Sequence, residues 1–466
     1  MKSQSAQIRT PLTETMIDEC PAIDIHVHAQ GTISPQTAWE LGLCNKLITV
    51  SQQADGTWQL QDGPLHIGKG DPAKRYSNIF CSRGGFEISL DENGAPIDLA
   101  YNYNCVGDGH DKFTGFDAVM ATVQGHRHPP GGLQTEEDYR FIMERYLQSC
   151  VRQNVRYTEA LQNIHIAHVL RPDLPPKEAR AQFFRLCRDI VKQFAQQNVH
   201  LRFHHCPNKT SKSNLPGALA ERSLEWPEWL KEANSIAPNV FVALNSAGHE
   251  EQERLDGGPF AMKKAYENAK NAGFGCEAHA GEGIGVEHML DTMQCLPVTR
   301  IAHGVQVIES QAAINEVLGR GITLIMMPYI NVTLGAPLHV KETTQGEIPH
   351  AKMQDGMRDP SVHTKHILDL TKHPIFTLMR DHSVPIALAT DNPEMGGMTY
   401  KEQVKLLAGF GSNFPSGFLP LSAEELALCN MHALKAAFCS RGVKEELAQA
   451  LLSWMTKYNI KIGLSI

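Results

Sequence analysis

Short apolar runs with β-strand character alternate with longer amphipathic patterns along most of this 466-residue chain. This alternation constrains the fold more than any other feature, because strands separated by crossover helices pair in parallel within one sheet. Eight such runs favour a closed (β/α)8 TIM-type barrel of the α/β class over an open sheet. The runs are residues 21–28, 155–161, 200–206, 240–246, 275–281, 299–305, 322–327 and 384–391.

One stretch interrupts this rhythm, from about residue 45 to about residue 110. It is rich in Gly, Asp and Asn, and Asp-Gly and Asn-Gly pairs stand between extended segments, which is typical of β-hairpins. We therefore expect a hairpin-rich insertion after the first strand of a single barrel domain over residues 1–466. Since strand-to-helix loops lie on the catalytic face of a barrel, the insertion is either a lid or specificity element, or a peripheral decoration or oligomer contact. A second irregular segment, 339–363, is expected on the same face, and its role is open.

The charge and composition of the chain argue against nucleic acid and membranes as partners. The net charge is -8 and no dense Lys/Arg block is present, which argues against nucleic acid. Lys209 and Lys212 are too sparse to form a basic patch, so we expect them in a solvated loop. No apolar run is long enough for a bilayer, and the polar start predicts no secretory leader. Eleven scattered cysteines without a CxxC pair suit reduced thiols in a cytoplasmic enzyme. A homo-oligomer is left open.

Two histidines mark the end of the first predicted strand. His26 and His28 are two residues apart, so both side chains point to the same face, which looks into the barrel. Imidazole nitrogens buried there need partners. A shared divalent metal ion is the simplest partner, and imidazole suits zinc.

Further polar residues stand at the ends of later strands. His279 lies near the end of the fifth run, and Glu282 follows where the strand should become a loop. A carboxylate beside a histidine ligand could move protons in metal-assisted hydrolysis. His303 ends the sixth run as a ligand, a base or a buried hydrogen-bonded histidine. Asp391 ends the eighth run and is costly to bury unless it meets a cation. Three histidines and one aspartate at one barrel face would complete a mononuclear site.

Two other pairs of histidines are expected to have structural rather than catalytic or metal-binding roles. His204 and His205 end the third run, so one of them should face outward, and we expect a polar role in a loop. His126 and His128 stand before a Pro-Pro-Gly-Gly sequence and indicate a turn.

These motifs together resemble the adenosine deaminase family of the metal-dependent amidohydrolase superfamily. The resemblance runs from about residue 21 to about residue 438, interrupted by the insertion. It implies a hydrolase acting on C–N bonds other than peptide bonds, one Zn²⁺ per chain and a small purine-type substrate. The matching segments are IHVHAQG, YTEAL, NSAGHE, HAGEG, RIAHG, NVTLGA and TDNP.

The resemblance also implies roles for single residues. Glu282 would protonate the ring nitrogen beside the carbon under attack. His303 would orient the attacking water and stabilise the oxyanion, and Asp391 would hold that water as well. The backbone amide of Gly248 would meet a ring nitrogen of the purine. The implied metal ligands are His26, His28, His279 and Asp391. The implied reaction is attack by zinc-activated hydroxide at purine C6 with release of ammonia.

The chain departs from the family pattern at substrate-binding positions. Asn392 stands where a second Asp usually contacts the purine five-membered ring, and Gln30 stands where an Asp usually meets the ribose 5′-hydroxyl. His249 and Asn245 also replace the usual Asp. We therefore expect a deaminase for adenosine or a related adenine-containing nucleoside or base, with Gln30, Gly248 and Asn392 at the substrate.

Two alternatives stay open. One is a related amidohydrolase acting on another amino-heterocycle, or on an N6-modified or 5′-modified adenine compound. The other is a homologue that binds a nucleoside without catalysis. A cytidine-deaminase type of site is disfavoured, because its H-x-E and P-C-x-x-C signature is missing.

Overall fold

The computed structural model describes residues 9–63, 75–83, 87–104, 112–124, 130–210, 217–343, 346–349 and 362–462. Eight parallel strands form one sheet in the order β1-β8-β9-β10-β11-β12-β13-β17. A parallel bridge between Val27 and Asp391 joins the first strand to the segment after the last one. The amide of His28 donates to the carbonyl of Asp391 at 2.7 Å across this joint. The predicted (β/α)8 barrel is thus confirmed.

Each observed barrel strand falls on one of the predicted apolar runs. Side chains on both faces of most of these strands are buried, which explains why the strands read as nearly continuous apolar runs rather than as alternating patterns. The strands are β1 (Ala22–His28), β8 (Val155–Gln162), β9 (His200–His205), β10 (Phe241–Leu244), β11 (Gly275–Ala280), β12 (Arg300–His303), β13 (Thr323–Met326) and β17 (Ile386–Leu388).

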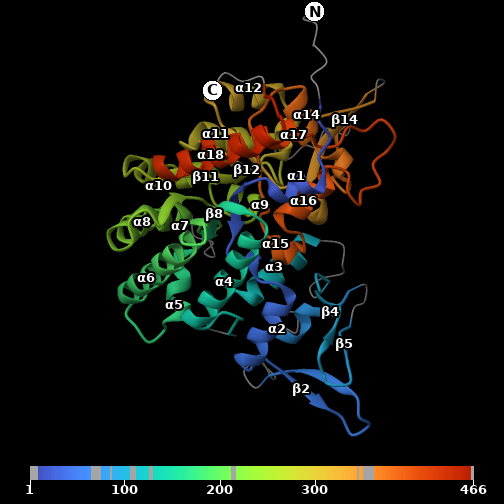
Figure 1. The fold of residues 1–466 in the computed structure, drawn as a ribbon. Coiled ribbons are helices and arrows are strands. Elements are labelled where there is room, and N and C mark those ends of the chain that lie inside the picture. The colour runs from blue at the N-terminus through green and yellow to red at the C-terminus, as the bar shows by residue number, and fades with distance from the viewer. Residues whose placement is uncertain are drawn as a thin grey trace, which may run out of the picture.

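Helices surround the barrel (Figure 1), and their buried side chains are largely apolar. The helix α6 illustrates the pattern, since Phe183, Cys187, Ile190 and Phe194 recur at helical spacing and are buried. The longer helices are α2 (Pro35–Cys44), α3 (Lys112–Val123), α4 (Glu136–Arg152), α6 (Pro176–Ala195), α8 (Glu225–Ile236), α10 (Gly258–Asn271), α11 (Val286–Cys295), α12 (Gln311–Arg320), α16 (Tyr400–Leu407), α17 (Ala423–Ala436) and α18 (Arg441–Lys457).

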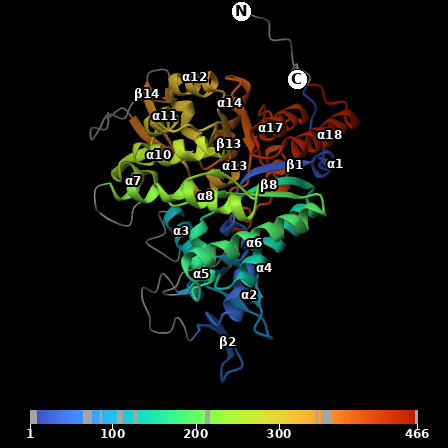
Figure 2. The ribbon, with the colours of Figure 1, turned by 90° about the vertical axis from the view of Figure 1, so that its left-hand side faces the viewer.

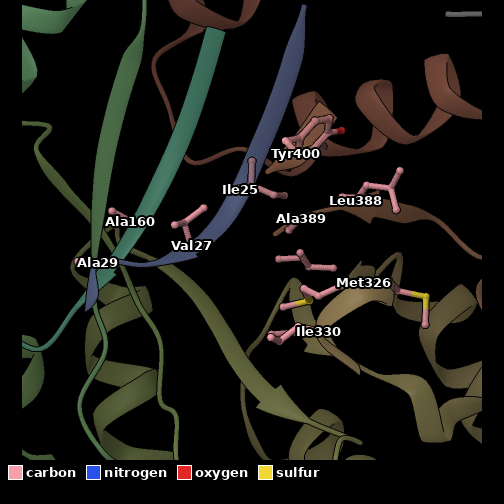
Figure 3. Packing of buried hydrophobic residues seen from close by; sticks show 14 of the residues in the cluster. Ile25, Val27, Ala29, Ala160, Met326, Ile330, Leu388, Ala389 and Tyr400 are labelled. Atoms are coloured by element: carbon pink, nitrogen blue, oxygen red, sulfur yellow. The ribbon is translucent and has the colours of Figure 1, made fainter. Parts of the chain in front are cut away.

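The core lies between the outer face of the strands and these helices. Figure 3 shows part of it, where Ile25 and Val27 of β1 lie among buried side chains that include Met326 of β13 and Tyr400 of α16. Close packing of this layer fixes the direction of each strand, and therefore fixes where each strand ends. The strand ends carry the chemistry described below.

The described part of the insertion consists of three small antiparallel pairs, as the Asp-Gly and Asn-Gly signals predicted. They are β2 (Ile48–Gln52) with β3 (Trp58–Asp62), β4 (Phe80–Ser82) with β7 (Leu99–Tyr101), and β5 (Ser89–Leu90) with β6 (Pro96–Ile97). In Figures 1 and 2, β2 projects away from the end of the molecule that carries α12. The hydroxyl of Tyr101 donates to the carbonyl of Ile33 at 2.8 Å, and that of Tyr103 donates to the carbonyl of Met395. The insertion therefore contacts the loops that follow β1 and β17.

The segment expected to be irregular, 339–363, is partly regular. In its described part, β14 (Pro337–Thr343) pairs with β15 (Gly346–Pro349) and with β16 (Val362–His366) in an antiparallel sheet. Within the described residues, no helix is both long enough and apolar enough to cross a bilayer. The predicted turn around His126 and His128 lies outside the described residues.

Candidate metal centre

The polar residues singled out in the sequence meet at the carboxyl ends of the barrel strands. His28 is the last residue of β1, His303 is the last residue of β12, and Asp391 follows β17. His303 and Asp391 have φ values of 65° and 64°, in the left-handed region that residues other than Gly rarely adopt. Such backbone strain occurs most often at functional sites, where the surrounding structure holds it in place.

Four of these side chains form one cluster. One ligand atom from each of His26, His28, His279 and Asp391 lies within 4.8 Å of those from the others. The Nε2 atom of His28 is 3.2 Å from Nε2 of His279 and 3.2 Å from Oδ1 of Asp391. Three of the four side chains are buried, and His28 is 14% exposed. The structure thus brings together all four predicted ligands.

The far nitrogens of two of these imidazoles are tied to other groups. Nδ1 of His26 lies 2.5 Å from Oε1 of Glu277, and Nδ1 of His279 lies 3.0 Å from Oδ1 of Asn245. The Asn245 amide in turn donates to Glu277 at 2.6 Å. These contacts leave the Nε2 atoms to face the cluster, which is how histidine ligands of metal ions are usually oriented.

The cluster favours a bound positive charge. Burial opposes protonation of His26, but the carboxylates of Glu277 and Asp391 outweigh it and raise the pKa of this imidazole to about 9. Burial and the neighbouring imidazoles hold the pKa of His279 well below its usual value. Nε2 of His26 and Oδ1 of Asp391 are buried and have no hydrogen-bond partner. Three imidazole nitrogens and one carboxylate oxygen therefore fit a divalent ion such as zinc.

Glu282 and His303 lie beside this cluster. Oε2 of Glu282 is 3.4 Å from Nε2 of His303, and the His303 ring lies 5.3 Å from the His279 ring. Burial, with the charge of Asp391 added, raises the pKa of Glu282 well above its usual value. Burial also lowers the pKa of His303 to about 4. The site thus places a carboxyl group with a raised pKa and a neutral imidazole next to four candidate metal ligands.

The sequence profile of the adenosine deaminase family matches residues 123–353, which include His279, Glu282 and His303. The chain belongs to the adenosine deaminase family. It is a hydrolase that acts on carbon–nitrogen bonds other than peptide bonds. The family resemblance seen in the sequence motifs is confirmed.

Named relatives agree with this membership. An adenine deaminase of Rhizobium johnstonii is 24% identical over 321 residues, which cover 69% of this chain and 80% of the relative. An adenosine deaminase of Clostridium perfringens is 24% identical over 225 residues, and the chain spans 55% of its length. An amidohydrolase from Burkholderia ambifaria, solved with bound Zn, shares the fold with a TM-score of 0.61 and 16% identity, over 98% of both chains.

A buried carboxylate holds the loop that carries Glu282. Glu250 is the first residue of α9 (Glu250–Leu255), and its oxygens accept hydrogen bonds from the amides of Glu282, Gly283 and Ile284 at 3.2, 2.8 and 3.0 Å. Burial opposes ionisation of Glu250, but Lys209 and His288 outweigh it and lower its pKa to about 2. Glu250 ends the NSAGHE segment but was not among the predicted site residues.

The predicted substrate-binding residues lie at the same end of the barrel. Gln30 and Asn392 are buried, and Nε2 of Gln30 and Oδ1 of Asn392 have no hydrogen-bond partner. A Cβ on Gly31 would lie 2.2 Å from Oδ1 of Asn392, so only glycine permits this approach. Gly248 lies in the loop after β10 with a φ of 125°.

The predicted solvent exposure of Lys209 and the predicted loop role of His204 and His205 were wrong. Lys209 is fully buried, because it pairs with Glu253 at 2.8 Å and donates to the carbonyl of His279 at 2.9 Å. His204 is buried inside the barrel against Glu159 at 2.8 Å. His205 does point away from the barrel interior, but it packs against Trp229 of α8 and is buried too. Helices cover the outside of the barrel, so facing outward does not mean facing water.

A buried ion network lies below the cluster and was also missed. Arg300 donates to Glu277 at 2.5 Å and to Glu159 at 2.6 Å, and its guanidinium lies 4.0 Å from the centre of the Phe438 ring. Charged residues in the middle of buried strands signal such a network, since a buried charge needs a partner. Here the network holds Glu277, which in turn orients His26.

Proposed function

We propose that this family member is a zinc-dependent hydrolytic deaminase of adenosine or a related adenine-containing nucleoside or base. One observation carries the proposal. A cluster of three imidazoles and a carboxylate lies next to a carboxyl group with a raised pKa and a neutral imidazole. This combination suits the replacement of an exocyclic amino group by oxygen at purine C6, with release of ammonia.

The cluster would hold one zinc ion through His26, His28, His279 and Asp391. Zinc bound there would supply a nucleophile near neutral pH, because it lowers the pKa of water to about 7 in favourable sites. Glu277 and Asn245 fix the orientation of the His26 and His279 rings through their Nδ1 atoms.

The raised pKa of Glu282 gives this carboxyl group its part in the reaction. The raised pKa favours the protonated form of Glu282, which can donate its proton to the ring nitrogen next to C6. Protonation of that nitrogen makes C6 electrophilic. The carboxylate that results can accept one proton from the attacking water and pass it to the amino group, which then leaves as ammonia. The remaining water proton leaves the hydroxyl group at C6 as the carbonyl forms, and it returns to Glu282. One water molecule is consumed and one ammonia is formed.

His303 would donate a hydrogen bond to the oxygen that becomes bonded to C6. Its pKa of about 4 keeps the imidazole neutral, and its Nε2 lies on the side of Glu282. A neutral imidazole that donates from Nε2 would stabilise negative charge on that oxygen. Asp391, which stays ionised in spite of burial, would hold the attacking water by a hydrogen bond.

The substrate side of the proposal rests on Gln30, Gly248 and Asn392. Gln30 and Asn392 can each donate or accept through their amides, where the family pattern has carboxylates. Unpartnered atoms on both side chains leave hydrogen bonds for a ligand. These amides suit a base without ribose or a changed 5′ group as well as they suit adenosine, which keeps adenine and modified adenosines in the proposal.

A substrate panel tests the proposal. Zinc-loaded protein is assayed for ammonia release from adenine, adenosine, AMP, 5′-modified adenosines and N6-methyladenine, with methylamine release followed for the last compound. We expect turnover with at least one unmodified adenine compound. Turnover confined to N6-methyladenine would favour the modified-base alternative. Binding without turnover of any compound would favour the non-catalytic alternative and overturn the proposal.

A further inference from the structure

Three buried groups form a hydrogen-bonded chain behind His303. The backbone amide of Ile375 donates to Nδ1 of His373 at 3.2 Å, and Nε2 of His373 lies 3.3 Å from Oδ1 of Asn331. Nδ2 of Asn331 then lies 3.0 Å from Nδ1 of His303. Asn331 belongs to α13 (Pro328–Leu334), and Ile375 begins α14 (Ile375–Arg380).

The backbone amide of Ile375 determines which atom donates in each of these hydrogen bonds. An amide N–H can only donate, so Nδ1 of His373 must accept and the proton of this imidazole must sit on Nε2. That N–H can only donate to the oxygen of Asn331. The amide nitrogen of Asn331 therefore faces His303 and donates to its Nδ1. His303, being neutral, must carry its own proton on Nε2.

Because these groups are buried, water cannot replace the hydrogen bonds between them. The exposed fractions of Asn331, His303 and His373 are 0%, 1% and 2%, so water does not compete for these contacts. A donor or acceptor left unpaired at such a depth costs about 1–3 kcal/mol, so the arrangement with every group paired dominates. The proton on Nε2 of His303 points toward Glu282, on the side of the reaction.

We propose that Asn331 and His373 are positioning residues that hold His303 in the tautomer with its proton on Nε2. This inference rests on the proposed function, because there the Nε2–H of His303 donates to the oxygen that forms at the substrate carbon. The other tautomer would turn a lone pair toward that oxygen. The loss of one such donor typically reduces kcat by about 10²–10³.

The replacement Asn331→Asp tests the proposal with almost no change of shape. A carboxylate can accept from His373 but cannot donate to His303, so the proton of His303 should move to Nδ1. We expect kcat to fall by about 100-fold or more, with KM and zinc content close to those of the unchanged protein. Asn315→Asp, at an exposed position of α12, is the matched control for the added charge.

Two replacements of His373 test the second position without adding charge. His373→Gln keeps a side-chain donor that can reach Asn331, whereas His373→Leu removes the donor. We expect His373→Gln to retain kcat within a factor of about three and His373→Leu to lose about tenfold. Equal losses in both variants would indicate a purely structural role and would overturn the proposal for His373.

A direct readout does not depend on turnover. In zinc-loaded full-length protein labelled with ¹⁵N in its histidine rings, correlation spectra report which ring nitrogen of His303 carries the proton, with His303→Asn used for assignment. The proposal predicts Nε2–H in the unchanged protein and Nδ1–H in Asn331→Asp. Nδ1–H in the unchanged protein would refute it. If no adenine compound were turned over but the predicted tautomers were seen, only the proposed function would fail.

Discussion

Glu282 and Asp391 show how the same functional group acquires opposite states within one site. Burial raises the pKa of Glu282 well above its usual value. Burial also opposes ionisation of Asp391, but the neighbouring imidazoles of His26 and His28 outweigh it and hold the pKa of Asp391 well below its usual value. Two carboxyl groups whose surroundings separate their pKa values are typical of acid–base catalysis. The difference supports the proposed roles, which are proton transfer for Glu282 and a negative charge for Asp391.

At the residue scale, Glu282→Gln is expected to retain zinc and lose turnover, because the amide keeps the shape of the side chain but has no acidic proton. General acid–base catalysis contributes about 10²–10⁴-fold, so kcat should fall by that factor. Steady-state kinetics and metal analysis measure both effects. Glu228→Gln, at an exposed position, is the control and should match the unchanged protein. Substantial turnover by Glu282→Gln would show that another group moves the proton.

At the scale of elements, α9 and the loop between β11 and α11 act as a unit. Glu250 accepts three backbone hydrogen bonds from this loop, and the loop carries Glu282. Lys209 also donates to the carbonyl of His279, so a different buried charge contacts each end of the segment. The position of the loop that carries Glu282 is therefore set by residues that the proposed mechanism does not use.

Glu250→Ala is expected to loosen this loop while the zinc ligands stay in place. Displacement of a catalytic group by about 1 Å can cost about 10²-fold, so we expect kcat to fall by about 10- to 100-fold with unchanged zinc content. Hydrogen exchange should show faster exchange at the amides of Gly283 and Ile284. Glu251→Ala, on the exposed side of α9, serves as the control. Unchanged exchange at those two amides would contradict the loop-holding role.

At the scale of the whole molecule, the candidate metal centre joins distant parts of the chain. His26 and His28 belong to β1, His279 to β11, and Asp391 follows β17, so a bound ion would cross-link the barrel where its first and last strands meet. An ion that binds the folded state alone stabilises it by mass action. The barrel also has an apolar core that is independent of the ion.

Removal of metal is therefore expected to lower the melting temperature without unfolding the barrel. Free zinc at about 1,000 times its Kd would add about 4 kcal/mol to the free energy of unfolding. Thermal unfolding with a chelator and after zinc is restored measures this difference. His28→Gln should abolish the response to zinc, whereas His200→Gln, next to Glu446 on the outside, should keep it. An equal response in both variants would place the ion elsewhere.

The buried carboxylates also predict how stability changes with pH. The pKa of Glu250 is lowered to about 2, and Arg300 holds that of Glu159 well below its usual range. Since the pKa of glutamate in an unfolded chain is about 4.3, these groups stabilise the fold fully above that pH. Their contribution is lost as the pH falls toward 2, by about 1.4 kcal/mol per unit of lowered pKa. Urea unfolding between pH 7 and pH 3 measures the loss, and a free energy of unfolding that stays constant below pH 4 would contradict it.

The sequence determined the strands and the candidate ligands of this protein. Buried parallel strands read as continuous apolar runs, and a polar residue directly after such a run stands at the end of its strand. His28, His303 and Asp391 could therefore be found without coordinates, and the hairpins of the insertion followed from their Asp-Gly and Asn-Gly turns. These signals are local, because a strand or a turn depends mainly on adjacent residues.

The tertiary structure alone decided which of the other buried polar groups meet. Lys209 read as a solvated residue but lies buried against Glu253, and nothing near Asn331 in the sequence indicates its contact with His303, 28 residues away. Each such group is stable at depth only because a partner from another strand or helix satisfies its charge or hydrogen bonds. That partner is chosen by barrel closure and helix packing, which bring together residues that no sequence pattern pairs.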